Sequence, residues 1–165
     1  MSVTPPNWRW RAGPLAPCPT VVFDIDGVLS DAAGRQHFID GGWGRARDWD
    51  AFFEACGEDP LVEEVASLLD LLDPDLGIVL LTGRPLRVQP QTLSWLAHND
   101  LRWDLLIMRN RGDYSQVASF KRASVAELRA HGLDLRLAFE DDPRNRDMFH
   151  SEGIPCIYIH SGYYE

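Results

Sequence analysis

The stretch Thr20-Val21-Val22-Phe23-Asp24-Ile25-Asp26-Gly27 joins an apolar run to two carboxylates and a glycine. Its β-branched and aromatic residues predict a short buried strand that ends at Asp24. Asp24 and Asp26 are two residues apart, so their side chains point to a common side. Such a pair can share a divalent cation or divide the roles of acid and nucleophile, and a polar turn is the alternative. An EF-hand is excluded, because its required glycine and glutamate positions hold Leu29 and Arg35.

The rest of the chain alternates predicted strands with predicted helices. Apolar runs predict strands at 77–82, 105–108, 135–139 and 156–159, and helical spacing predicts helices from residue 61 and at 91–98, 120–131 and 144–150. Nearly all-apolar strands in this order are typical of a parallel sheet covered on both faces. We therefore expect one α/β domain over residues 20–165, a three-layer Rossmann-like domain with a central parallel sheet.

Two segments lack such a pattern. Residues 1–19 are rich in proline and tryptophan, and we expect an extended lead-in with no regular element. Residues 30–50 are polar and glycine-rich, which predicts a loop or a small hairpin.

The composition limits the classes of function. Lys+Arg 16 against Asp+Glu 25 gives a net charge of −9, which disfavours indiscriminate binding to nucleic acid or to an anionic membrane. No apolar run approaches the roughly 20 residues that span a bilayer, and residues 1–19 lack the apolar core of a signal peptide. Cys18, Cys56 and Cys156 are odd in number and have no CxxC spacing, so free thiols in a cytoplasmic protein are the simplest interpretation.

Polar residues follow the predicted strands at the point where each strand ends, and open α/β sheets bind ligands at that edge. They are Asp24 and Asp26, Thr82-Gly83-Arg84, Arg109 and Arg111, and Glu140-Asp141-Asp142. Adjacent acids repel one another unless a cation compensates them, so an oxygen-ligated Mg²⁺ is the best interpretation of the acids taken together. The hydroxyl, glycine and guanidinium of residues 82–84 suit a phosphate.

The basic residues are unevenly placed. Lys121 is the only lysine, and it stands at the start of a predicted helix, where dipole and ammonium both favour an anion. From Arg84 to Arg122, seven basic and three acidic residues give a local charge of +4, and such a segment could follow a nucleic-acid backbone. Trp43 and Trp49 could stack on a base or pack within their own loop.

In this order the motifs resemble those of the haloacid dehalogenase (HAD) superfamily of phosphotransferases. The ordered set is Asp24-x-Asp26-Gly, Thr82 after the second strand, Lys121, and then Asp141-Asp142. Within that superfamily the sequence resembles the 3′-phosphatase domain of polynucleotide kinases of the bacteriophage type. The similar stretches are FDIDGVLSDAAGR (23–35), Gly83-Arg84, MRNRGD (108–113) with Lys121 eight residues further on, AFEDDPRNRDMF (138–149) and EGIPCIYIHSGYYE (152–165).

The resemblance implies a phosphoryl transfer in two steps. Asp24 would attack phosphorus and form an aspartyl-phosphate, and Asp26 would act as general acid and then as general base. Thr82 and Lys121 would stabilise the phosphate oxygens.

The resemblance also implies a ligand set. Mg²⁺ would be held by Asp24, by the backbone carbonyl of Asp26 and by Asp141 or Asp142. Residues expected to bind the substrate phosphate or support catalysis are Gly83, Arg109, Arg35 and Arg84, besides Thr82. An acid is expected one turn before the lysine, where this sequence has Val117, and Asp113 or Asp142 is the expected substitute as the orienting partner of Lys121.

The intervals between motifs bear on the substrate. The 55 residues between Asp26 and Thr82 and the 38 between Thr82 and Lys121 are too few for a full cap domain, so we expect a capless site or a minimal insert. Three functions fit: a polynucleotide 3′-phosphatase, a capless phosphatase of nucleotides or other small phosphoesters, and a non-catalytic module that binds Mg²⁺ or phosphate. The sequence has no GxxxxGK[ST] motif, so a kinase or ligase partner is expected to be a separate protein.

Overall fold

Six strands form one sheet in the order β1-β4-β3-β2-β5-β6 in the computed structural model, which describes residues 3–41, 44 and 46–164. The strands are β1 (Trp8–Trp10), β2 (Pro19–Phe23), β3 (Gly77–Pro85), β4 (Leu105–Arg109), β5 (Asp134–Glu140) and β6 (Cys156–Tyr158). All neighbours are parallel except β1, which pairs antiparallel with β4. The predicted α/β class and central parallel sheet are confirmed, and β2, the strand that ends at Asp24, lies between β3 and β5.

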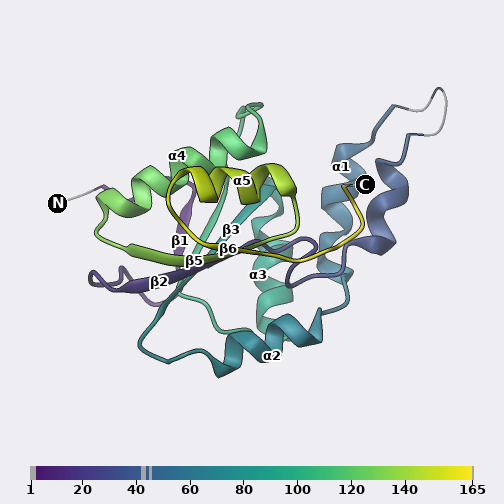
Figure 1. Ribbon diagram of the computed structural model, residues 1–165. Coiled ribbons are helices and arrows are strands. Elements are labelled where there is room, and N and C mark those ends of the chain that lie inside the picture. The colour runs from purple at the N-terminus through teal and green to yellow at the C-terminus, as the bar shows by residue number, and fades with distance from the viewer. Residues whose placement is uncertain (1–2, 42–43, 45, 165) are drawn as a thin grey trace.

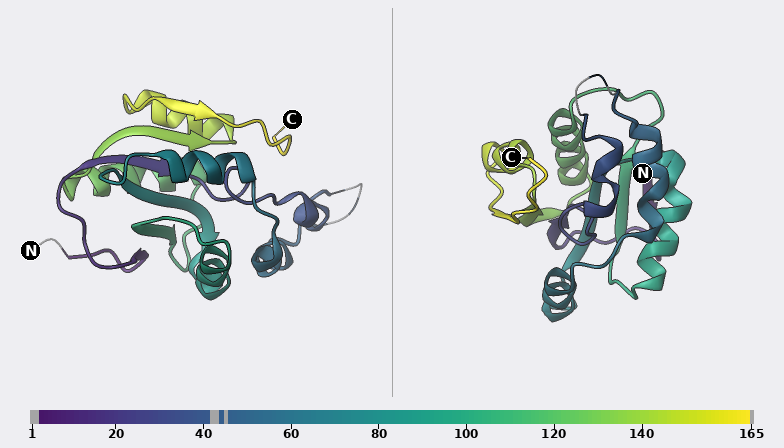
Figure 2. Two further views of the ribbon diagram at one scale, coloured as in Figure 1. Left: turned by 90° about the horizontal axis from the view of Figure 1, so that it is seen from below. Right: turned by 90° about the vertical axis from the view of Figure 1, so that its right-hand side faces the viewer.

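Helices cover both faces of this sheet (Figure 1). They are α1 (Trp49–Glu54), α2 (Glu63–Leu71), α3 (Gln89–His98), α4 (Val117–Ala130) and α5 (Pro143–Ser151), with 3₁₀ helices η1 (Ala33–Phe38), η2 (Ala55–Glu58) and η3 (Leu86–Val88). Figure 1 shows α4 and α5 on one face and α2 and α3 on the other, and the left view of Figure 2 looks onto the second face. The result is the predicted three-layer arrangement.

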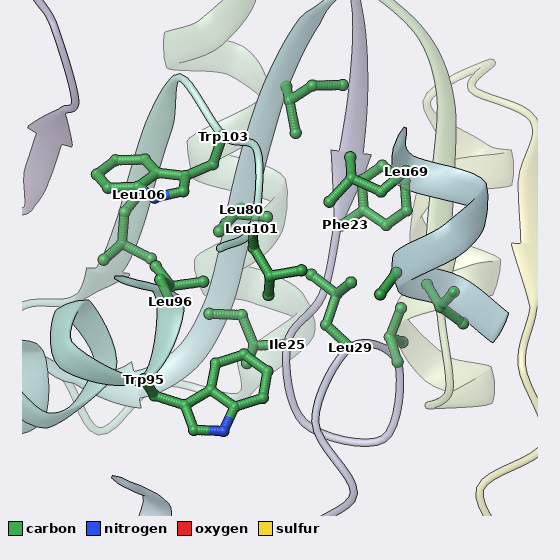
Figure 3. Close-up of a cluster of buried hydrophobic side chains, with 14 of the residues drawn as sticks. Phe23, Ile25, Leu29, Leu69, Leu80, Trp95, Leu96, Leu101, Trp103 and Leu106 are labelled. Atoms are coloured by element: carbon green, nitrogen blue, oxygen red, sulfur yellow. The ribbon is translucent and has the colours of Figure 1, made fainter. Parts of the chain in front are cut away.

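The core follows from the alternation of side chains along each strand. Val21 and Phe23 of β2 point to the face that carries α2 and α3, where Trp95 and Trp103 are also buried. Figure 3 shows this cluster around Phe23 and Trp95. Val22 points to the opposite face and packs with residues of α4 and α5. Because β2 is buried on both faces, its end is held rigidly.

The structure corrects the expectation for residues 1–19 and refines the one for residues 30–50. Residues 1–19 were expected to hold no regular element, but Trp8–Trp10 adds an edge strand to the sheet by pairing with residues 105–107 of β4. Within residues 30–50 the described part forms η1 and the start of α1, and no hairpin. The sequence patterns also missed α1, whose first turn is capped by the Asp48 side chain accepting from the Ala51 N–H.

The carboxyl ends of the parallel strands meet at one end of the sheet. Helix α1 and the C-terminal residues both lie at this end, at the right of Figure 1, and the two views of Figure 2 show them apart from each other. Between Asp26 and Thr82 the described residues form α1, α2 and two 3₁₀ helices, so no separate cap domain is inserted there. Within the described part of the chain, no helix is both long and apolar enough to cross a membrane.

Candidate active site

Asp24 is the first residue after β2 and faces Lys121. The Asp24 N–H donates to the Phe139 carbonyl at 3.1 Å, which continues the pairing of β2 with β5. Its Oδ1 accepts from the Ile25 N–H at 2.8 Å and lies 3.1 Å from Lys121 Nζ. Burial raises the pKa of Asp24, Lys121 opposes this rise and the charge of Asp26 adds to it. The Asp24 carboxylate is therefore fixed in place and in need of more positive charge than Lys121 alone supplies.

Lys121 lies in the second turn of α4, and its ammonium is buried. Its partner is Glu140, the last residue of β5, to which Nζ donates in addition to its contact with Asp24. Burial alone would lower the pKa of Lys121, but the charges of Asp24 and Glu140 outweigh burial and raise it, so the side chain stays charged.

The expectation that Asp113 or Asp142 orients Lys121 is therefore wrong. Asp113 accepts from Ser115 within its own loop, and Asp142 caps α5 by accepting from the Arg144 N–H at 2.9 Å. Glu140 takes the place of the acid missing at Val117, because β5 ends directly beside the lysine.

Asp141 is a buried acid whose carboxylate lacks a well-placed hydrogen-bond donor in the described part of the chain. Neither of its carboxylate oxygens has a hydrogen bond of standard geometry among the described residues, although the Ser161 hydroxyl lies near enough to lower its pKa. Burial, with the charge of Asp24 adding to it, raises the pKa of Asp141 to about 8. A buried carboxylate without donors is costly unless a cation binds it.

The acids around Asp24 fit a divalent metal ion. Asp24, Glu140 and Asp141 have carboxylate oxygens within 4.8 Å of one another. These three carboxylates and the single Lys121 ammonium leave a net charge of −2 when all are ionised. An all-oxygen donor set of this charge suits Mg²⁺. Because Glu140 is engaged by Lys121, Asp24 and Asp141 are the carboxylates left to hold the ion.

The side chains of Asp142 and Asp26 lie outside the acidic group of Asp24, Glu140 and Asp141. The Asp142 carboxylate caps α5 and pairs with Arg144 at 2.8 Å, and it is not part of the acidic group. The Asp26 carboxylate accepts from Arg35 Nη2 at 2.7 Å and from Arg84 Nη2 at 2.6 Å. Burial acts to raise the pKa of Asp26, but the charges of Arg84 and Arg35 outweigh it and hold this pKa well below the usual range. A metal contact from the Asp26 backbone carbonyl stays a prediction.

A second acid completes the network around Asp26. Asp59 accepts from Arg35 Nε at 2.8 Å and from the Ser30 hydroxyl at 2.6 Å, and it lies 3.4 Å from Arg84 Nη2. Two aspartates and two arginines balance to zero charge, so this network needs no further ion. Asp59 lies in the segment after η2, and no spacing in the sequence linked it to the site.

A pocket of about 860 Å³ opens beside these groups. Asp24, Asp26 and Lys121 line it, and so do Gly83 and Arg109 among the predicted phosphate-binding residues. The guanidinium groups of Arg35 and Arg84 lie behind Asp26, and the Thr82 hydroxyl accepts from the Arg84 N–H at 3.1 Å. The predicted site residues thus lie close together, but four of them, Thr82, Arg84, Arg35 and Asp141, do not line the pocket themselves.

The outer walls of the pocket combine aromatic and basic side chains, of which Trp49 and Arg111 were singled out from the sequence. They include Trp49, Phe52, Phe53, Tyr114, Tyr163 and Tyr164, with Arg87, Arg111 and Arg144. Trp49 is half-exposed, and Trp43, the other tryptophan predicted to stack on a base, lies outside the described residues. The pocket is larger than a phosphate group needs and can admit a group attached to one.

The fold and the site place the chain among the HAD-type phosphatases. The model of the family "Polynucleotide kinase PNKP phosphatase domain" matches residues 18–164. This match covers nearly the whole sequence, so the chain belongs to that family. No curated protein matches the chain.

Solved structures share this fold at low sequence identity. A chain of the Pnkp1/Rnl/Hen1 complex is 24% identical, with a TM-score of 0.72 over 86% of this chain and 45% of that chain. A chain of the Pnkp1/Rnl/Hen1 RNA repair complex is 22% identical, with a TM-score of 0.73 over 96% of this chain and 47% of that chain. A HAD-superfamily hydrolase from Geobacter sulfurreducens is 15% identical, with a TM-score of 0.57 over 85% and 86%. The present chain thus spans less than half the length of the two Pnkp1-complex chains.

Proposed function

We propose that this phosphatase removes the 3′-phosphate from nucleic-acid ends and requires Mg²⁺. The observation that carries the proposal is the pocket of about 860 Å³ beside Asp24, whose walls carry aromatic and basic side chains and over which the described residues form no cap domain. Aromatic and cationic side chains together suit bases and backbone phosphates. Membership of the polynucleotide kinase phosphatase family supports the same substrate.

The first step transfers the phosphoryl group to Asp24. The Asp24 carboxylate attacks phosphorus, the bond from phosphorus to the 3′-oxygen breaks, and an aspartyl-phosphate forms. Lys121 stabilises the negative charge on the transferring oxygens, and Glu140 holds Lys121 in place. When bound by Asp24 and Asp141, Mg²⁺ would neutralise charge between the nucleophile and the phosphate.

Asp26 moves the protons. Arg84 and Arg35 keep Asp26 ionised while the site is free. The charge of the bound phosphate then raises the pKa of Asp26, which takes a proton from solvent and passes it to the leaving 3′-oxygen. In the second step Asp26 accepts a proton from water, whose oxygen attacks phosphorus and releases Asp24 and inorganic phosphate. In place of a direct phosphate contact, we assign Arg35 and Arg84 the task of fixing the Asp26 carboxylate.

The partners follow from the repair chemistry. Removal of a 3′-phosphate leaves a 3′-hydroxyl, which a ligase can join to a 5′-phosphate made by a kinase. The Pnkp1/Rnl/Hen1 complexes are solved assemblies that each contain a chain similar to this one, which supports a kinase or ligase partner. The free cysteines support a cytoplasmic location.

Three substrates test the proposal: an oligonucleotide with a 3′-phosphate, the same strand with a 5′-phosphate, and a nucleoside 3′-monophosphate. Phosphate release is measured with Mg²⁺ or with EDTA. We expect Mg²⁺-dependent release that is fastest from the 3′-phosphorylated strand. Faster release from the mononucleotide would support the alternative of a small-phosphoester phosphatase, which the net charge of −9 favours.

The covalent intermediate has its own test. Asp26→Asn removes the base of the second step, while the good leaving group of p-nitrophenyl phosphate needs no acid in the first. We expect a burst of one nitrophenol per enzyme followed by near arrest, and no burst in Asp24→Asn. Steady turnover by Asp26→Asn without a burst would contradict the assignment.

A further inference from the structure

The loop between β4 and α4, residues 110–116, holds a tyrosine and an arginine out beside the pocket. Tyr114 lines the pocket and is nevertheless 95% exposed, so its ring contributes almost nothing to the packing of the fold. Arg111 also lines the pocket and is exposed, and among the described residues it makes no ion pair or hydrogen bond. An exposed aromatic ring and an unpaired guanidinium at a pocket mouth are available to a ligand.

The other basic residues of the pocket are already engaged. Arg87 pairs with Asp50 and Glu54, Arg109 faces Asp113 at 3.6 Å, and Arg144 pairs with Asp142. Of the seven basic residues between Arg84 and Arg122, Arg102 is bound to backbone carbonyls of residues 72, 73 and 76, and Arg122 to Glu152. The segment from Arg84 to Arg122 therefore does not form a continuous basic surface. Among the described residues that line the pocket, Arg111 is the basic residue of this segment that has no ion pair or hydrogen bond.

The loop that presents these two side chains is braced from within. Asp113 Oδ1 accepts from the Ser115 N–H at 2.9 Å and from the Ser115 hydroxyl at 2.5 Å, and Arg109 donates to the Ser115 carbonyl. Gly112 turns the chain at φ +78°. Because these bonds already fix the backbone around Tyr114, binding a ligand there costs little ordering of the loop.

We propose that this loop binds the nucleic-acid strand upstream of the terminal phosphate, Tyr114 by stacking on a base and Arg111 by pairing with a backbone phosphate. The inference rests on the proposed function and adds to it that the loop selects a strand over a single nucleotide. The charge of the unpaired Arg111 favours a polyanion at this place, although the chain as a whole carries −9. Stacking accepts any base, so the loop selects for length and not for sequence.

The test follows KM and kcat along a length series: p-nitrophenyl phosphate, a nucleoside 3′-monophosphate, and 3′-phosphorylated strands of two and four nucleotides, as DNA and as RNA. We expect the wild-type KM to fall as nucleotides are added. Tyr114→Ala should raise the KM of the four-nucleotide strand about tenfold more than that of the aryl phosphate, and Tyr114→Trp should restore it. Arg111→Ala should reduce the dependence of log KM on log salt by about 0.7.

Arg136→Ala is the matched control, because it removes an exposed arginine of β5 that does not line the pocket. It should leave all substrates and the salt dependence as in the wild type. An equal rise in KM for the strand and for the aryl phosphate in Tyr114→Ala would overturn the inference, since Tyr114 would then support the fold of the site and not bind the strand. Wild-type release that does not improve with length would overturn it too. If the wild type cleaves the aryl phosphate and no 3′-phosphorylated strand, the proposed function itself fails.

Discussion

Gly27 lets the Asp141 carboxylate reach the acidic group beside Asp24. Gly27 has φ +80°, and a Cβ at this position would lie 2.6 Å from Asp141 Cγ. The order of an aspartate pair followed by a glycine therefore has a steric reason in this fold. The glycine supplies both the left-handed backbone turn and the space into which the carboxylate of the neighbouring strand projects.

Gly27→Ala should damage metal binding and stability together. The left-handed backbone alone costs about 1–2 kcal/mol for a residue with a Cβ, and the methyl group must also displace Asp141. Gly34→Ala is the control, because Gly34 has ordinary backbone and no atom within 4 Å of the added Cβ. Thermal unfolding with and without Mg²⁺ measures both effects. Equal effects of the two substitutions would refute the steric explanation.

The adjacent acids of residues 141 and 142 should respond differently to amidation. Asp141→Asn removes an unpartnered carboxylate from the metal group and should weaken Mg²⁺ activation at least about tenfold. Asp142→Asn keeps a good helix cap and should leave Mg²⁺ activation near that of the wild type. Titration of phosphate release against Mg²⁺ distinguishes them. A larger loss of Mg²⁺ activation in Asp142→Asn than in Asp141→Asn would show that Asp142 is the metal ligand.

An acid on α4 should be able to replace Glu140 as the counter-ion of Lys121. Glu140→Gln leaves Lys121 with Asp24 as its remaining counter-ion and should lower kcat about 10- to 100-fold. Val117 lies one turn before Lys121 on α4, so Val117→Asp in the Glu140→Gln background should recover part of the loss. Steady-state kinetics measure the rescue. A double variant no better than Glu140→Gln would show that Glu140 does more than hold the lysine.

The metal-free protein should lose stability as the pH rises. The pKa of Asp141 is raised from 3.8 to about 8, so between these values the folded state binds more protons than the unfolded state. The free energy of unfolding then falls with rising pH, by up to about 1.4 kcal/mol per unit. Mg²⁺ should reverse the trend, because it binds the ionised acids. Urea unfolding from pH 5 to pH 8, in EDTA and in Mg²⁺, measures both slopes; a flat profile in EDTA would contradict the burial of a free acid.

The sheet and most of the site could be predicted because they depend on short patterns. The apolar runs that end in Asp24, Thr82 and Asp141 predict both the strands and the edge where these residues meet. Strand β1 was missed because prolines surround it and its pairing with β4 depends on a distant segment. Helix α1 was missed because it spans only Trp49–Glu54 and follows a glycine-rich stretch.

The roles of the buried acids required the tertiary structure. The triplet at 140–142 showed that acids gather after β5, but not that Glu140 faces Lys121, Asp141 faces Asp24 and Asp142 caps α5. Their different directions follow from the exit of the chain from β5 into α5. Asp59 carries no local pattern, and only the fold brings it to Arg35, 24 residues earlier in the chain.

In the proposed reaction Asp24 takes the phosphate from a nucleic-acid 3′ end. A single-turnover reaction with a strand carrying ³²P in its 3′-phosphate tests it most directly, with wild type and Asp24→Asn compared in Mg²⁺. We predict label released as inorganic phosphate by the wild type, none by Asp24→Asn, and little from the 5′-labelled strand. Release by Asp24→Asn at the wild-type rate would show that Asp24 is not the nucleophile, and equal release from both ends would show that the enzyme does not select the 3′ end.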